Sequence, residues 1–217
     1  MAKVKICGIC SAEDIDAINK ALPDYIGFVF APGKRQINPD TAAKLMEKLN
    51  PHIETVGIFK NENIETVATL YQNRIIDLAQ LEGDEDDNYL FRLKDSYGCR
   101  IIKAASLDRP LPAFEEMPDY LIVDISGSGM GDGSRGEPGS SVGSNGTSSS
   151  GGFDWQAFSK TVGLPFFVTG DITADNVADI VRAANPYCVN VNLPFGDDGK
   201  VDIEGMREFI KIVRAGA

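Results

Sequence analysis

Histidine is almost absent from this sequence of 217 residues, in which His52 is the only one. A Ser-His-Asp or Cys-His catalytic arrangement would have to use that imidazole, and its proline-flanked position indicates a loop rather than a catalytic site. Cysteine is also scarce, with Cys7, Cys10, Cys99 and Cys188. Cys7 and Cys10 form one Cys-x-x-Cys pair, which would suit a redox dithiol or half of a zinc site, but no second pair follows. We therefore expect no bound metal.

Positive charge is in short supply, because 21 Lys and Arg residues stand against 32 Asp and Glu residues and the formal net charge is −11. Such a balance argues against nucleic acid or an anionic membrane as a partner. It does not exclude a small anionic ligand, which needs only a few local donors. Long hydrophobic runs are missing as well, and none approaches the length of a membrane span. With no signal peptide at the start and few cysteines, we expect reduced thiols and a cytoplasmic location.

What the sequence does contain is a regular alternation of short apolar segments with helical patterns, and 43% of its residues are hydrophobic. Eight strands, each followed by a helix or helical turn, predict an α/β fold of the (β/α)8 barrel type, with residues 1–217 as one domain. An open doubly wound sheet is the alternative, but no Gly-x-Gly-x-x-Gly motif follows the first strand. The expected strands span 3–7, 25–30, 55–59, 76–81, 100–104, 120–124, 165–169 and 188–192. The first expected helix begins after Ser11. The others span 39–49, 63–71, 86–97, a short piece near 113, 155–161, 174–184 and 203–215.

One segment interrupts this alternation. Residues 126–152 are dominated by Gly, Ser, Asn and Asp, and they show neither a helical nor a strand pattern. This composition predicts a mobile chain, because few of the side chains could bury apolar area to offset the entropy of ordering. The segment follows the sixth strand at the end of the barrel where ligands bind. A tolerated insertion and an active-site lid both remain open as its role.

The first strand carries the most informative thiol of the chain. Val4 and Ile6 alternate with lysines, and the strand ends at Cys7 followed by Gly8. In a parallel α/β fold this end of a strand is where ligands bind, and a glycine there lets the backbone turn sharply. Cys7 is therefore a candidate for chemistry, although a free cysteine in this position is more often simply packed in the core.

With the strand order in place, the chain resembles the phosphoribosylanthranilate isomerase family of tryptophan biosynthesis. The resemblance covers the whole chain outside the Gly/Ser-rich segment, and it rests on several motifs taken together. These are Lys5-Ile6-Cys7-Gly8, Gly27-Phe28-Val29-Phe30 with Lys34-Arg35, Val56-Gly57-Ile58-Phe59 with Asn61, Gln80-Leu81 with Gly83, Asp124 at the end of the sixth strand, and Phe153-Asp154-Trp155.

The resemblance implies a small-molecule substrate, no cofactor, and an Amadori rearrangement of a phosphorylated aminoaldose to an aminoketose by general acid–base catalysis. Asp124 would protonate the furanose ring oxygen, Cys7 as a thiolate would take a proton from the adjacent carbon, and Arg35 would hold the anthranilate part. A thiol needs a lowered pKa for this role, and donors or positive charge near the end of the strand would supply it. The other expected substrate-binding residues are Gln80, Glu82, Gly170, Asp171, Asn190 and Asn192, and we expect a monomer.

The sequence also departs from the family pattern at the ends of several strands. Glu82 stands where the family usually has histidine, and Asp171 stands where it has the second glycine of a phosphate-binding pair. Leu193-Pro194-Phe195 replaces a smaller, polar segment, and the Gly/Ser-rich segment replaces a Gly-Thr-Gly-Lys-Thr type of motif. An alternative is therefore a repurposed or engineered barrel without the phosphate site, acting on or binding an apolar molecule with Glu82 or Asp171 as a base. An inert scaffold is the third hypothesis.

Overall fold

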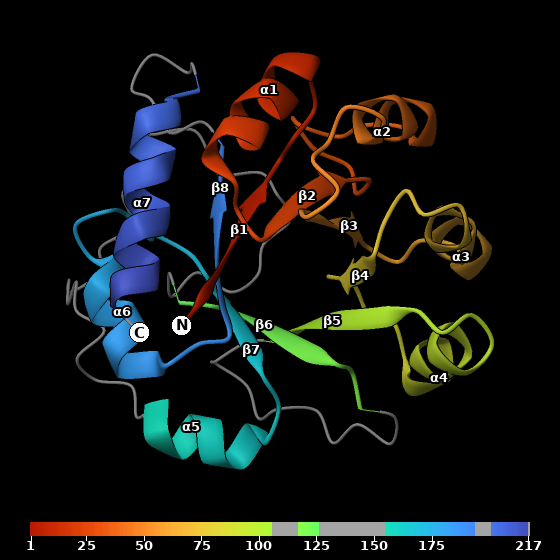
Figure 1. Ribbon diagram of the computed structural model, residues 1–217. Helices are drawn as coiled ribbons and strands as arrows, with labels where there is room; N and C mark the ends of the chain where they lie inside the picture. The colour runs from red at the N-terminus through yellow and green to blue at the C-terminus, as the bar shows by residue number, and fades with distance from the viewer. Residues whose placement is uncertain (106–116, 126–154, 194–200, 217) are drawn as a thin grey trace, which may run out of the picture.

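The computed structural model describes residues 1–105, 117–125, 155–193 and 201–216. Eight parallel strands follow one another around a closed barrel, and the last strand pairs with the first (Figure 1). This confirms the (β/α)8 prediction and excludes the open doubly wound sheet. The strands are β1 Lys3–Cys7, β2 Tyr25–Val29, β3 Glu54–Phe59, β4 Leu78–Leu81, β5 Arg100–Ala105, β6 Tyr120–Asp124, β7 Phe166–Thr169 and β8 Cys188–Asn192.

Helices surround the barrel on its outer side (Figure 1). The described helices are α1 Ala12–Ala21, α2 Pro39–Met46, α3 Ile64–Gln72, α4 Asp87–Asp95, α5 Trp155–Val162, α6 Val177–Ala184 and α7 Ile203–Ala215. None of these helices is long and apolar enough to cross a membrane. The short helical piece expected near 113 and the Gly/Ser-rich segment 126–152 lie outside the described residues.

Capping residues account for several helix starts. Ser11 begins α1 with a reciprocal capping box, in which its side chain accepts a hydrogen bond from the backbone of Asp14 and the Asp14 carboxylate accepts one in return. Asn38 caps α2 ahead of Pro39, which takes the first helical position. The predicted boundaries were less accurate elsewhere, because β4 begins at Leu78 rather than 76 and α6 begins at Val177 rather than 174.

Side-chain alternation along the strands creates two hydrophobic clusters. The outer cluster lies between the strands and the helices, and Val4 and Ile6 of β1 belong to it. The inner cluster fills the barrel and includes Tyr25 and Phe167, both fully buried. Complete burial of one such apolar side chain contributes roughly 1.5–3 kcal/mol, so both clusters stabilise the closed ring. The inner cluster consists of Tyr25, Val56, Leu78, Ile102, Ile122, Phe167 and Cys188.

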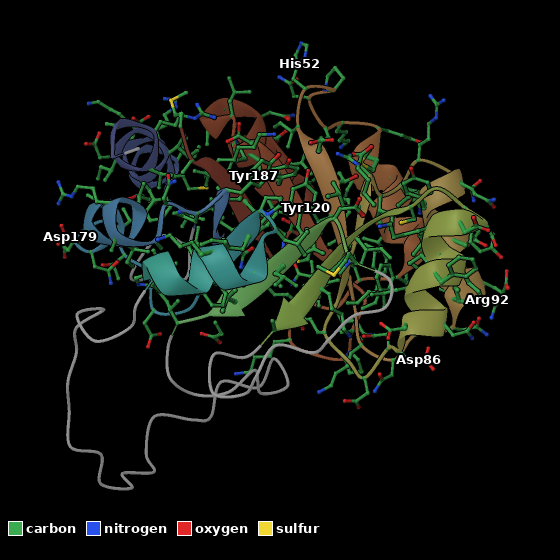
Figure 2. The ribbon with its side chains drawn as sticks, turned by 90° about the horizontal axis from the view of Figure 1, so that it is seen from below. His52, Asp86, Arg92, Tyr120, Asp179 and Tyr187 are labelled. Atoms are coloured by element: carbon green, nitrogen blue, oxygen red, sulfur yellow. The ribbon has the colours of Figure 1, made fainter. Side chains whose placement is uncertain are left out.

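Aromatic and charged side chains close the end of the barrel at which the strands begin. The Lys3 ammonium donates to the Tyr25 hydroxyl over 3.0 Å, and that hydroxyl lies 3.0 Å from the hydroxyl of Tyr187. The rings of Tyr120 and Tyr187, both labelled in Figure 2, are 4.9 Å apart between centroids. This end of a (β/α)8 barrel contributes to stability rather than chemistry, so we look for the site at the opposite end.

Candidate active site

The carboxyl ends of the strands bring most of the predicted site residues to one end of the barrel. Cys7 ends β1 and pairs in register with Gly27 of β2 and Asn192 of β8. Asp124 ends β6 and pairs with Thr169 of β7. The remaining predicted residues belong to the same end: Gln80 lies in β4, Asn190 in β8, and Glu82, Gly170 and Asp171 directly follow strands, with Arg35 in the loop after β2.

The single histidine lies elsewhere. His52 is exposed, and it occupies the turn before β3, at the end of the barrel where the strands begin (Figure 2). A parallel barrel places that turn far from the carboxyl ends of the strands. The proton transfers of a site near Cys7 must therefore rely on other side chains.

Cys7 is confined by its neighbours. The residue is 8% exposed, and a Cβ atom on Gly27 would come within 2.9 Å of the Cys7 sulfur, so a side chain at 27 has no room. Burial raises the pKa of the Cys7 thiol above its ordinary value, and the Glu82 carboxylate acts in the same direction. Lys5, a backbone hydrogen bond from Gly8 and Arg35 favour the thiolate but do not outweigh burial. The expectation of a lowered pKa for Cys7 is therefore wrong for this structure.

A chain of hydrogen bonds runs across the interior of the barrel beneath the site. The ammonium group of Lys5 donates to the Gln80 side-chain oxygen over 2.5 Å, and the Gln80 amide nitrogen donates to the Glu82 carboxylate over 2.8 Å. Lys5 is fully buried and Gln80 is 3% exposed, whereas Glu82 is exposed. Sequence reasoning identified Gln80 and Glu82 but missed Lys5, although its inward-facing position two residues before Cys7 was a signal that could have found it.

Asn190 supplies a polar group that lacks a partner. Its amide nitrogen donates to the Thr169 hydroxyl over 2.8 Å, but its buried side-chain oxygen accepts no hydrogen bond within the described part of the chain. Buried polar atoms in native proteins nearly always have a partner, so an unsatisfied one marks a place where a bound molecule could supply it. The prediction of Asn190 as a ligand-binding residue is consistent with this geometry.

Arg35 is held against the turn between β1 and α1. Its guanidinium donates to the carbonyl of Gly8 over 2.6 Å and lies 3.4 Å from the Asp14 carboxylate and 3.5 Å from the sulfur of Cys10. The side chain is 31% exposed, so part of the guanidinium is accessible. Cys7 and Cys10 are both free thiols in this structure, and burial raises the pKa of Cys10 as well.

The loop between β7 and α6 contains the expected phosphate-binding residues. Gly170 has a φ angle of 133°, a conformation that favours glycine. The side chain of Asn176 fixes the loop by donating to the carbonyl of Asp171 over 2.9 Å and accepting from the backbone of Thr173 over 2.8 Å. The Asp171 residue itself is exposed. A carboxylate on this loop would oppose the approach of an anionic group.

A buried ion pair, which sequence reasoning missed, joins Lys103 of β5 to Glu85 in the loop after β4. The ammonium group of Lys103 lies 2.5 Å from the Glu85 carboxylate, and their side chains are 8% and 1% exposed. Lys103 also donates to the carbonyl of Gly83 over 2.7 Å, and Glu85 accepts from the backbone of Asn61 over 2.8 Å. An acidic run such as 84–87 ahead of a helix indicates a solvated first turn, but the Glu85 side chain is buried. Lys103 on the neighbouring strand β5 neutralises its charge.

This arrangement defines the class of the protein. A closed (β/α)8 barrel that gathers a thiol, carboxylates and amides at the carboxyl ends of its strands has the layout of a barrel enzyme. Within the described residues, no group of three or more His, Cys, Asp or Glu side chains could hold a metal ion. The groups present at this end, Cys7 and Asp124 among them, are suited to proton transfer.

Comparison with known proteins identifies the family. The model of the N-(5'-phosphoribosyl)anthranilate isomerase family matches residues 4–212, and the chain belongs to this family. The chain is 34% identical over 215 residues to the isomerase of Endomicrobium trichonymphae, covering 99% of this chain and 100% of that protein. It is 36% identical over 213 residues to that of Lachnoclostridium phytofermentans, covering 96% and 95%. These matches confirm the resemblance seen in the motifs and do not favour the repurposed barrel.

Solved structures of the same family share the fold. The isomerase of Thermus thermophilus superposes with a TM-score of 0.72 at 25% identity, covering 98% of each chain. A phosphoribosyl anthranilate isomerase solved in complex with reduced 1-(o-carboxyphenylamino)-1-deoxyribulose 5-phosphate also gives 0.72, at 23% identity, covering 99% of this chain and 100% of that one. At such identities the superposition supports the barrel fold and assigns no role to individual site residues.

Proposed function

We propose that this protein isomerises N-(5'-phosphoribosyl)anthranilate to the corresponding aminoketose by an Amadori rearrangement, with Asp124 and Cys7 as the proton-transfer pair. The family match over residues 4–212 is the observation that carries the reaction. The placement of the two side chains at the ends of β6 and β1, which open onto the same end of the barrel, supports their roles.

The two groups would act in sequence on one bound substrate. Asp124, in its acid form, gives a proton to the furanose ring oxygen so that the ring opens. Cys7, in its thiolate form, then takes the proton from the carbon next to the resulting iminium, and an enol results that rearranges to the ketone. Because burial raises the pKa of Cys7, only a minor fraction of the thiol is ionised at neutral pH, and that fraction sets how much of the enzyme can take the proton.

The remaining predicted residues would bind the substrate. The accessible part of the Arg35 guanidinium can pair with the anthranilate carboxylate, a geometry that arginine favours. Asn190 can accept a hydrogen bond from a substrate hydroxyl with its unsatisfied oxygen. Asn192 is exposed at the end of β8 beside Cys7, where it could contact the same substrate. Gln80 and Glu82 lie at β4, on the other side of the barrel from β8.

The experiment that tests the pair is a turnover assay that follows loss of substrate fluorescence. Cys7→Ser and Asp124→Asn should each lower the rate by on the order of a hundredfold to ten-thousandfold, the usual effect of removing a positioned acid or base. Cys10→Ser, which removes the other thiol of the pair, and Asp179→Asn on the exposed surface of α6 are the matched controls. Retained turnover in the first two variants, with loss of turnover in Glu82→Gln or Asp171→Asn, would assign the base to a new carboxylate.

We further propose that this protein binds the substrate phosphate less tightly than a relative with two glycines after β7. Gly170 permits the close approach of an anion, but Asp171 adds a negative charge to the same loop. Asp171→Gly should therefore strengthen the binding of a phosphorylated substrate analogue in calorimetry, whereas a dephosphorylated analogue should bind equally to both forms. Tight phosphate-dependent binding by the unaltered protein would contradict this proposal.

We also propose that the chain acts as a monomer of one domain in the cytoplasm. Pairing of β1 with β8 closes the barrel within a single chain, and the net charge of −11 opposes self-association. Sedimentation equilibrium should give the mass of one chain, and a mass of two chains would refute the monomer.

A further inference from the structure

Lys5 is an unusual residue because its charge is buried inside the barrel. The residue is 0% exposed, and within the described residues its ammonium group makes one hydrogen bond, to the neutral side-chain oxygen of Gln80. No carboxylate of the described residues lies within ion-pair distance of it. A buried cation without a paired anion is costly, so its retention calls for an anion that is present only at some stage of function.

The hydrogen-bond chain from Lys5 compensates its charge only indirectly. Gln80 receives a hydrogen bond from Lys5 and gives one to Glu82, so its amide dipole links the cation to a carboxylate. Because Glu82 is exposed, water screens much of its charge. The short bond to Gln80 fixes the position of the ammonium group but does not neutralise it.

Two buried thiols experience the charge of Lys5, Cys7 on the same strand and Cys188 on β8. Cys7 is the one that lies at the carboxyl end of its strand, where ligands bind. Lys5 and Cys7 are two positions apart in β1, so both point into the barrel and their Cα atoms are about 7 Å apart. The charged groups that act on Cys7 from other elements are Glu82 after β4 and Arg35 after β2, with Asp124 at the same end on β6. Its register neighbours on β2 and β8, Gly27 and Asn192, carry no charge.

We propose that Lys5 is the buried counter-ion of the Cys7 thiolate, a positioning residue that Gln80 holds in place. The inference deepens the proposed function and rests on it, because it assigns to a specific cation the stabilisation of the base. Lys5 favours the ionised form of Cys7 and Glu82 disfavours it, which agrees with the signs of their effects on the Cys7 pKa. The pair Lys5 and Glu82 thus sets the fraction of enzyme that is ready to accept a proton.

The test is a titration of Cys7 followed by NMR on protein labelled with carbon-13 at the cysteine β-carbon, with the Cys7 signal assigned by its loss in Cys7→Ser. Lys5→Met should raise the apparent pKa of Cys7 by about one unit or more, which is a tenfold smaller thiolate fraction at neutral pH. Glu82→Gln should move it in the opposite direction. Lys3→Met is the matched control, because Lys3 lies on the same strand and face but at the other end of the barrel.

Folding and function are checked separately. Lys5→Gln, which can still donate to Gln80, is a second neutral variant in case Lys5→Met does not fold, and near-ultraviolet circular dichroism verifies each variant. Lys5→Arg keeps the charge and should restore a titration close to that of the unaltered protein. In the turnover assay at a fixed neutral pH, kcat/KM should fall in Lys5→Met in proportion to the smaller thiolate fraction and recover in Lys5→Arg.

The outcomes discriminate between the two proposals. An unchanged Cys7 titration in folded Lys5→Met or Lys5→Gln would overturn the counter-ion role, whatever the turnover assay shows. Equal shifts in Lys5→Met and Lys3→Met would also overturn it, because they would indicate a general effect of net charge. Retained turnover in Cys7→Ser would refute Cys7 as the base while leaving the measured coupling between Lys5 and Cys7 intact.

Discussion

Removal of the Lys103 ammonium should strongly destabilise the protein. Lys103→Met leaves the Glu85 carboxylate, whose side chain is 1% exposed, without the cation that lies 2.5 Å away. Breaking a buried ion pair by deleting one partner costs roughly 3–5 kcal/mol, because the remaining charge stays buried and uncompensated. The bond from Lys103 to the carbonyl of Gly83 is lost in the same variant, so we expect a cost within that range rather than below it.

Urea unfolding followed by circular dichroism measures this cost. For a chain of this length, about 3–5 kcal/mol corresponds to a fall in Tm of roughly 6–20 °C. The double variant Lys103→Met with Glu85→Gln should recover much of the loss, since a neutral amide replaces the stranded carboxylate and can still accept from the backbone of Asn61.

An exposed ion pair provides the control. Arg92 on the outer side of α4 lies 3.4 Å from Glu65, and their side chains are 48% and 63% exposed (Figure 2). Arg92→Met should cost at most about 1 kcal/mol, the usual value for exposed pairs. Two results would refute this reasoning: a loss of stability in Lys103→Met no larger than in Arg92→Met, or a double variant less stable than Lys103→Met. Either would mean that the uncompensated charge of Glu85 is not the cause of the destabilisation.

Three further predictions follow from close contacts and buried thiols. Gly27→Ala should lower kcat in the turnover assay, because the new methyl group would lie 2.9 Å from the Cys7 sulfur and displace it. Gly83→Ala should destabilise the fold by about 1–3 kcal/mol in urea unfolding, since its Cβ would lie 2.2 Å from the side-chain oxygen of Asn61. The contribution of the buried thiols Cys99 and Cys188 to stability should be constant below the ordinary thiol pKa and be lost as the pH rises above it. Burial raises the pKa of Cys99 to about 12 and also raises that of Cys188, so these thiols ionise in the unfolded chain first; Cys99→Ala should flatten the fall in the urea midpoint.

The sequence by itself determined the class of fold and the main candidates for chemistry. Strand and helix periods are local properties, so the alternation along the chain was enough to predict eight strands and their order around the barrel. The same periodicity placed Cys7 and Asp124 at the ends of their strands. Element ends were less predictable where no capping signal stood at the boundary, as at the start of β4.

Only the tertiary structure decided which charges are buried and what they face. Lys5 and Gln80 are 75 positions apart, and Lys103 meets Glu85 from a neighbouring strand, so no local pattern relates the members of either pair. The pKa of Cys7 depends on the same closure, because burial in the finished barrel outweighs the nearby positive charges. Side chains in a barrel strand point alternately to the inside and the outside of the barrel. A charged side chain is therefore buried or exposed according to what surrounds it once the ring has closed.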